Sequence, residues 1–160
     1  MVIIYLDDLQ AQKPMQDELR VILNDTDSDA DDDNLLGSSL ASRNRHAKAV
    51  DVAGMRIAGR GVVFRGRVRS PPSDPAIALP GDLVRFVGRG NLWRNGLMRK
   101  HRSTIFAVDD VSLMTRRADV LIPHEATSVH RHGWGAVDAL ASSLRVRQSL
   151  HGHHHACLHF

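Results

Sequence analysis

Arginine, glycine and aromatic residues recur in this sequence in a pattern that is suited to binding phosphates. The segment from Arg56 to Arg65 reads RIAGRGVVFR and the segment from Arg85 to Arg94 reads RFVGRGNLWR, so arginine or glycine is shared at five aligned positions. Guanidinium groups bind phosphate oxygens through paired hydrogen bonds, and aromatic rings stack on bases. Residues 56–102 carry eleven lysines and arginines against two acidic side chains. The pattern predicts a basic surface for RNA or another polyanion.

The residues predicted to form this surface combine positive charge with stacking faces, and glycine lets the backbone approach a ligand closely. The candidate nucleic-acid-binding residues are Arg60, Arg65, Arg67, Arg89, Arg94, Arg99, Lys100, Phe64 and Trp93. The prediction requires the two segments to fold into neighbouring ribbons whose arginines share a face. The alternative is a small barrel that has the aromatic rings inside and the arginines in solvent.

A run of aspartates at alternate positions suggests a second chemistry. Residues 24–34 read NDTDSDADDDN, and this run resembles an EF-hand calcium loop, in which oxygen ligands also alternate. In a loop beginning at Asp25, Ala30 takes the place of the sixth-position glycine and Leu36 that of the final glutamate. The resemblance implies weak calcium binding, with Asp25, Asp27, Asp29 and Asp31 as candidate ligands. The alternative is an acidic linker that is extended by self-repulsion.

The last ten residues, HGHHHACLHF, are rich in nitrogen and sulfur ligands for nickel, copper or zinc. His153 and His155 are the candidate ligands in this tail. A structural zinc site needs ligand pairs that the fold holds apart, so the tail would have to be joined by other ligands such as His130 and His132. We therefore expect a frayed, His-rich end and no resident metal.

Complete catalytic motifs are absent from the sequence. It has no phosphate-binding loop of the Walker type, no Gly-x-Ser-x-Gly and no His-Glu-x-x-His. Asp109 and Asp110, with His124 and Glu125, are the best candidates for an acid–base set, but paired acids after a strand are typical of a turn. We expect no enzymatic activity and no cofactor.

The composition of the chain predicts how many domains it has, what its core contains and where in the cell it is found. The 160 residues suit one domain, and the 4% aromatic content predicts a thin core of valine, leucine, isoleucine and alanine. The net charge of +3 conceals an asymmetry, because residues 1–36 carry ten acidic and two basic side chains. Cys157 is the single cysteine, and no apolar run approaches the roughly 20 residues that span a bilayer. The N-terminus lacks the basic start of a secretory signal. These features predict a soluble, cytoplasmic protein with no membrane partner.

Hydrophobic periodicity predicts an α+β fold, with a small, twisted antiparallel sheet in the middle and one or two flanking helices. Strands are predicted over residues 2–6, 61–68, 83–87, 104–108 and 120–122. Helices are predicted over residues 14–23 and through Val137, Leu140, Ala141 and Leu144, and residues 40–52 are weakly helical. Prolines exclude a regular element between residues 71 and 80. The regions are an acidic segment (1–39) ending in a disordered loop, a basic body (40–150) containing the repeat, and a His-rich tail (151–160).

The opening of the chain resembles a known group of translations. Its LDDLQAQ, DELRVIL and DADDDNLLG stretches resemble antisense-frame translations from GC-rich genes, some of which are named NAD-specific glutamate dehydrogenase. The resemblance is compositional, covers about the first 40 residues and carries over no catalytic residue. It implies a chain without evolved activity, which is the alternative to polyanion binding.

Overall fold

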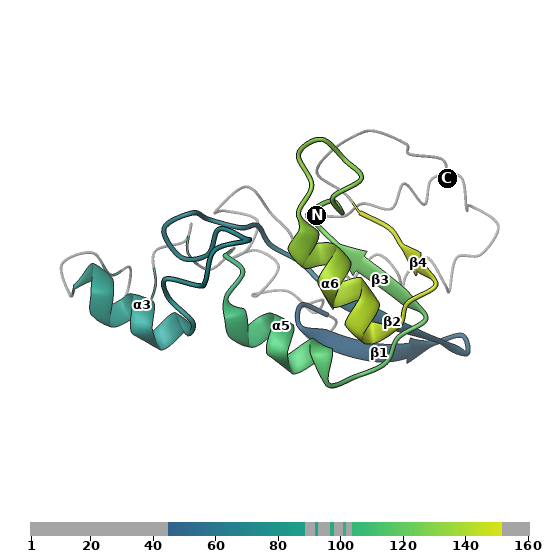
Figure 1. Ribbon diagram of the computed structural model, residues 1–160. Coiled ribbons are helices and arrows are strands. Elements are labelled where there is room, and N and C mark those ends of the chain that lie inside the picture. The colour runs from purple at the N-terminus through teal and green to yellow at the C-terminus, as the bar shows by residue number, and fades with distance from the viewer. Residues whose placement is uncertain (1–44, 89–91, 93–96, 98–100, 102–103, 152–160) are drawn as a thin grey trace, which may run out of the picture.

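The fold is built around a four-stranded sheet in the strand order β1-β2-β3-β4, with helices α5 and α6 beside it and α3 farther away (Figure 1). This computed structural model describes residues 45–88, 92, 97, 101 and 104–151. The sheet and the helices confirm the predicted α+β class. The predicted elements before residue 40, the acidic loop and most of the His-rich tail lie outside the described residues.

Strands β1 (Lys48–Val52) and β2 (Met55–Arg60) form an antiparallel hairpin that pairs Val52 with Met55. Its two turn residues, Ala53 and Gly54, both have left-handed φ angles, 48° and 80°. Left-handed φ angles at both turn residues give the two-residue loop a twist that matches the right-handed twist of the flanking strands. The prediction of weak helix was wrong for residues 48–52, because pairing with β2 outweighs a weak local preference.

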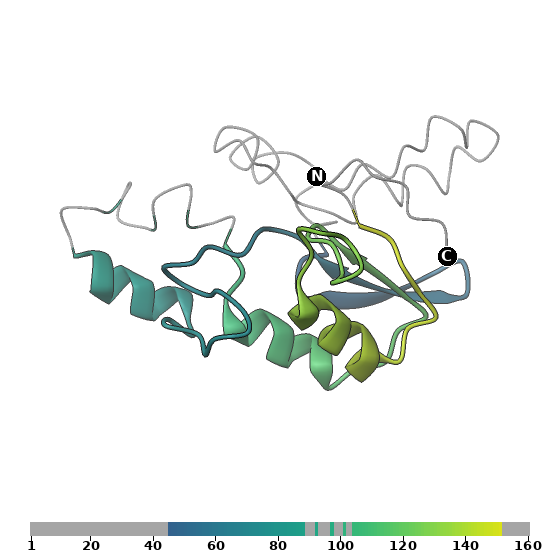
Figure 2. The same ribbon diagram turned by 45° about the horizontal axis from the view of Figure 1, so that its top comes forward.

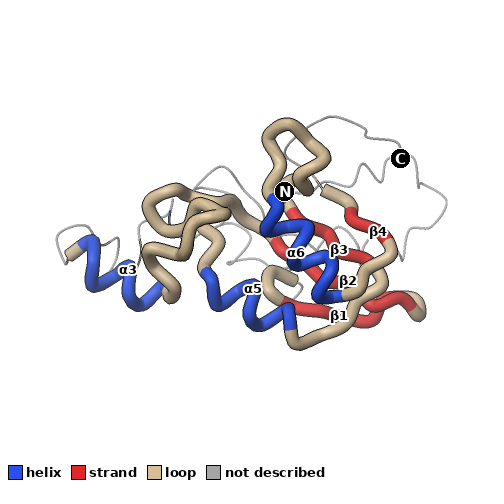
Figure 3. Tube along the Cα trace, in the orientation of Figure 1, coloured by secondary structure: helices blue, strands red, loops and turns tan. Residues whose placement is uncertain are grey.

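The remaining strand pairs are parallel. Strand β3 (Val120–Pro123) pairs with β2, and β4 (Gln148–Ser149) pairs with β3. The sheet is therefore mixed, and the prediction of an antiparallel sheet was wrong beyond the hairpin. Parallel neighbours need a crossover connection, and here α6 (Gly135–Leu144) connects β3 to β4 (Figure 3). The predicted strand at residues 120–122 and the helix through Val137 and Leu144 are confirmed.

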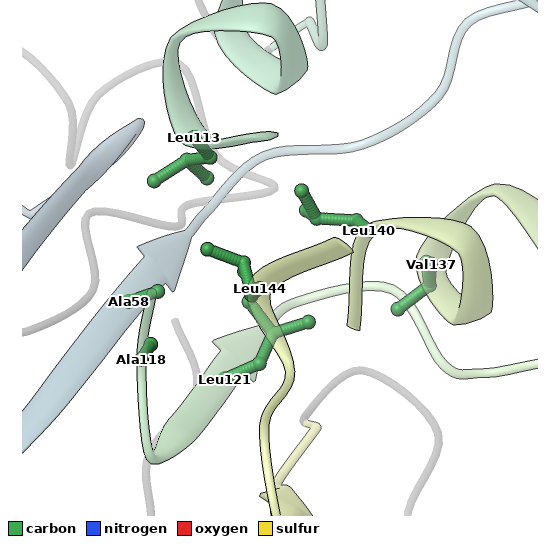
Figure 4. Close-up of a cluster of buried hydrophobic side chains, with 7 residues drawn as sticks. All are labelled: Ala58, Leu113, Ala118, Leu121, Val137, Leu140 and Leu144. Carbon is green, nitrogen blue, oxygen red and sulfur yellow. The ribbon is translucent and has the colours of Figure 1, made fainter. Parts of the chain in front are cut away.

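The main hydrophobic core lies between the sheet and two helices, α5 (Ala107–Met114) and α6 (Figure 4). Its buried residues are all alanine, valine or leucine: Ala58, Leu113, Ala118, Leu121, Val137, Leu140 and Leu144. Because β2, β3 and both helices contribute to this one cluster, α5 and α6 cover the same face of the sheet.

A second, smaller core holds α3 (Pro80–Val87) at the other end of the molecule (Figures 1 and 2). Its buried residues are Val68, Ile77, Leu83 and Phe106. The strand predicted over residues 83–87 is helical instead, since Pro80 suits a first helical position and Asp82 favours the first turn.

Two further strand predictions were wrong. Residues 104–108 lead into α5, where the Asp109 carboxylate accepts the Phe106 backbone N–H at 2.8 Å and so caps the helix. Residues 61–68 form turns, with one isolated bridge between Val63 and Thr104. The segment from 71 to 79 has no regular element, as its prolines predict.

The two arginine–glycine segments do not share a conformation. Residues 56–60 of the first copy lie in β2, whereas Arg85, Phe86 and Val87 of the second copy end helix α3. The aligned glycines also differ in role. A side chain at Gly59 would come within 2.6 Å of the Arg45 carbonyl oxygen, while Gly88 ends α3 with a φ of 74°. The prediction of two similar ribbons therefore fails for the described part of the second copy.

Candidate functional site

Arg60, the first candidate in the predicted basic surface, is fully buried. Its Nε lies 2.6 Å from Asp110 Oδ1, and its Nη2 lies 3.2 Å from Oδ2. Arg69 also contacts Asp110, through Nη1 at 2.7 Å from Oδ2. Asp110 thus pairs with two guanidinium groups in the interior. Assigning Arg60 to a polyanion surface was wrong, because the fold uses its charge internally.

Phe64 lies within the same cluster. The guanidinium carbon of Arg60 is 4.5 Å from the centroid of the Phe64 ring, and that of Arg69 is 5.4 Å away. The Trp134 ring packs at 4.9 Å between centroids with a 54° tilt. Protein groups therefore surround the ring that was predicted to stack on a base.

The other predicted site residues are divided between the surface and the undescribed part of the chain. Arg67 is exposed in a turn and Arg65 is partly buried. The candidates that lie outside the described residues are Arg89, Trp93, Arg94, Arg99, Lys100, Asp25, Asp27, Asp29, Asp31, His153 and His155. Within the described ranges, no group of three histidine, cysteine or acidic side chains is arranged to hold a metal ion.

Glu125 and Asp109, which the acid–base alternative required, hold the fold together. Glu125 Oε1 accepts the Phe64 backbone N–H at 3.0 Å, and Oε2 accepts Trp134 Nε1–H at 3.2 Å. Asp109 caps α5 and lies 3.4 Å from His46 Nε2. Both carboxylates are therefore engaged in bonds that position backbone and side chains.

Three histidines that are separated in sequence meet at the surface. The His130 ring lies 5.7 Å from that of His132 and 6.2 Å from that of His151, between centroids. Desolvation lowers the pKa of His130, and the nearby His132, His151 and Arg131 lower it further. His130 therefore favours its neutral form more strongly than an isolated histidine does.

A positively charged pocket lies at the end of the sheet at which the parallel strands β2, β3 and β4 begin. Its volume is about 420 Å³, and it is lined by Asp51, Gly54, Arg56, Arg117, Ala118, Asp119, Leu144, Arg145 and Arg147. These residues come from the β1–β2 hairpin, the α5–β3 connection and the α6–β4 connection, which meet at one end of the molecule (Figures 1 and 2).

One arginine of the pocket is already neutralised. Arg56 donates from Nε and Nη2 to the two oxygens of Asp51, at 2.9 and 2.8 Å. This hydrogen bonding lowers the pKa of the Asp51 carboxyl group, which keeps it ionised at neutral pH. The second acid, Asp119, accepts the Arg56 backbone N–H at 2.8 Å through Oδ2.

The other three arginines give the pocket its charge. Arg117, Arg145 and Arg147 are all exposed, and within the described part of the chain none of them forms an ion pair with an acidic side chain. The C-termini of helices α5 and α6 lie beside these arginines, and the C-terminus of a helix carries roughly half a negative charge. Together with Asp119 these charges leave the pocket positive.

Arg145 occupies this position at a conformational cost. It caps the C-terminus of α6 in the left-handed conformation, with a φ of 57°, and its N–H donates to the Ser142 carbonyl oxygen at 3.1 Å. Glycine is the usual residue at such a position because it has no Cβ to clash. The backbone of a pocket residue is therefore strained.

Sequence reasoning did not identify Arg117, Arg145 or Arg147. They lie in two short groups 28 residues apart, T-R-R-A-D and L-R-V-R-Q, outside the basic middle. For Arg145 the available signal was its place directly after the predicted helix through Leu144, whereas no helix was predicted before Arg117. Only the parallel pairing of β2, β3 and β4 shows that the two groups reach one pocket.

Comparison with known proteins identifies a relative but no family. The chain is 41% identical over 123 residues to an uncharacterized protein of Haemophilus influenzae, and the match covers 77% of this chain and 54% of the relative. The chain thus spans about half the length of that relative. No protein-family model matches the chain, and no solved structure matches it. Among the described residues, no helix is both long enough and apolar enough to cross a membrane.

Proposed function

We propose that the chain binds RNA or another polyanion through the pocket formed by Arg56, Arg117, Arg145 and Arg147. The supporting observation is that three exposed guanidinium groups surround one cavity without an acidic partner within the described residues. The ligand class is the one that the sequence predicts. The residues are different, because Arg60 and Phe64 are used inside the fold.

The geometry favours a segment of single strand. A volume of about 420 Å³ falls in the range of small-molecule pockets, roughly 300–1,000 Å³. One nucleotide unit fits this scale, whereas a duplex would have to lie across it. Arginine binds phosphate through two parallel hydrogen bonds, so each of the three free guanidinium groups can hold one phosphate.

Phosphate binding of this kind has a measurable salt dependence. Each neutralised phosphate of a single strand contributes about −0.7 to the slope of log affinity against log salt. Three contacts give a slope of about −2, so affinity for single-stranded RNA should fall roughly 20-fold between about 50 and 200 mM salt. Fluorescence anisotropy with a labelled single-stranded RNA measures this slope.

A charge-matched pair of variants tests the location. The pocket variant replaces Arg117, Arg145 and Arg147 with glutamine. The control replaces Arg67, Arg85 and Arg131, which are also exposed, and so removes the same net charge. At low salt, the affinity of the pocket variant for RNA should be lower by about tenfold or more, and its slope of log affinity against log salt should be less steep by about 2. In the control variant, both quantities should change little. Equal losses in both variants, or no RNA binding by the unaltered protein at low salt, would refute the proposal.

A further inference from the structure

We infer that the pocket prefers ribose to deoxyribose, because the Asp119 carboxylate beside the arginines accepts a hydrogen bond from the 2′-hydroxyl group. The inference rests on the proposed function and specifies its ligand. Asp119 is unexpected in a phosphate-binding pocket, because its carboxylate repels the phosphate that the arginines attract.

Asp119 is held firmly at the floor of the pocket, at the start of β3. Its backbone N–H donates to the Arg56 carbonyl oxygen at 2.7 Å, and its carbonyl oxygen accepts the Arg147 N–H at 2.9 Å. Its side chain accepts the Arg56 N–H through Oδ2. Strands on both sides thus fix the position of the carboxylate relative to the arginines.

The two acidic side chains of the pocket differ in how many further hydrogen bonds their oxygens can accept. Both oxygens of Asp51 are engaged by the Arg56 guanidinium group. Among the described residues, the Asp119 carboxylate accepts one hydrogen bond, on Oδ2, and a carboxylate offers about four acceptor sites. Oδ1 of Asp119 is therefore the pocket oxygen that is best able to receive a donor from a ligand.

The donor nearest to a phosphate in RNA is the ribose 2′-hydroxyl group, which DNA lacks. It both donates and accepts hydrogen bonds, and proteins use it to distinguish the two nucleic acids. Phosphates on Arg117, Arg145 and Arg147 would bring an adjoining sugar toward Asp119, which lines the same cavity. The hydrogen bond also compensates for the repulsion between the carboxylate and the phosphate.

The test compares oligoadenylate with oligodeoxyadenylate of equal length at one low salt concentration, so that the 2′-hydroxyl groups are the chemical difference. A hydrogen bond to a charged group predicts about tenfold tighter binding of the ribose strand. Two variants locate the effect. Asp119→Ala removes both the acceptor oxygens and the charge, so binding of the deoxy strand should rise and the preference should fall toward one. Asp74→Asn, at an exposed position outside the pocket, removes the same charge and should leave the preference unchanged.

Each outcome has a separate meaning. Failure to bind either strand would overturn the proposed function together with this inference. Equal binding of both strands by the unaltered protein would overturn the inference and leave polyanion binding intact, and this measurement does not depend on any variant folding. A preference that persists in Asp119→Ala would also overturn it, because the 2′-hydroxyl group would then be read elsewhere. A purely structural Asp119 would not change the ratio of the two affinities.

Discussion

Arg60 and Asp110 show how the environment of a residue decides what its charge does. Both side chains are almost completely inaccessible to solvent, and Asp110 is shared with Arg69. Arg60 Nη1 is buried and has no hydrogen-bond partner among the residues that the structure describes. The cluster therefore contains a well-paired carboxylate and an incompletely satisfied guanidinium group, and the two should respond differently to substitution.

We predict that Asp110→Asn destabilises the protein more than Arg60→Met does. Asp110→Asn leaves the buried Arg60 charge without a carboxylate, a change that typically costs about 3–5 kcal/mol. Arg60→Met removes the unsatisfied nitrogen and leaves Asp110 paired with Arg69, so its cost should be smaller. Urea unfolding of the two variants measures the difference in free energy of unfolding. A larger loss in Arg60→Met would contradict this account of the cluster.

At the scale of elements, α6 ends in a way that favours the pocket over stability. An arginine in the left-handed region costs about 1–2 kcal/mol relative to glycine, and Arg145 has this conformation. The same residue projects from the end of the helix into the group of arginines that lines the cavity. Glycine at position 145 would therefore suit the helix cap, whereas arginine suits the pocket.

We predict that Arg145→Gly stabilises the protein and weakens its binding to RNA. Removing the Cβ relieves the strain, and the greater flexibility of glycine in the unfolded chain offsets part of the gain, which leaves about 0.5–1 kcal/mol. Thermal unfolding and anisotropy titration measure the two effects. Arg145→Ala is the matched control, since it removes the charge but keeps the strain, so it should weaken binding without the gain in stability. A fall in stability for the glycine variant would contradict the prediction.

At the scale of the whole molecule, the described residues contain two cores of unequal size. Seven buried residues join the sheet to α5 and α6, whereas four join α3 to its loop and to Phe106. Helix α3, which the smaller core holds, lies at the opposite end of the molecule from the β1–β2 hairpin, whose residues line the pocket (Figure 2). A region with less buried apolar surface opens at a lower free energy than the rest of the protein.

We predict that the amide hydrogens of α3 exchange faster than those of β2 and α6. Leu83→Ala, in the smaller core, should increase exchange in α3 and leave β2 protected. Leu140→Ala, in the larger core, should lower protection throughout the sheet, because a buried leucine contributes about 2–5 kcal/mol. Hydrogen exchange followed by mass spectrometry measures both variants. Uniform loss of protection in Leu83→Ala would show that the two cores unfold as one unit.

The short strand at residues 120–122 and the helix through Val137 and Leu144 could be predicted from the sequence alone. Each is a local run whose own hydrophobic pattern matches its final state. The conformation of residues 83–87 could not be predicted in this way. Their apolar run suits a strand or a buried helix, and Pro80 together with packing against Val68 and Ile77 decides for the helix.

For this protein, the sequence by itself determined the α+β class, the positions of β3 and α6 and the presence of many arginines. Tertiary structure alone decided which arginines are available to a ligand. Arg60 and Arg117 are the same residue type, yet one pairs with Asp110 in the interior and the other lines an open pocket. The physical reason is that the effect of a charge depends on its partners and its distance from water. The partner of Arg60 is 50 residues away in the sequence, and packing of α5 against the sheet brings the two side chains together.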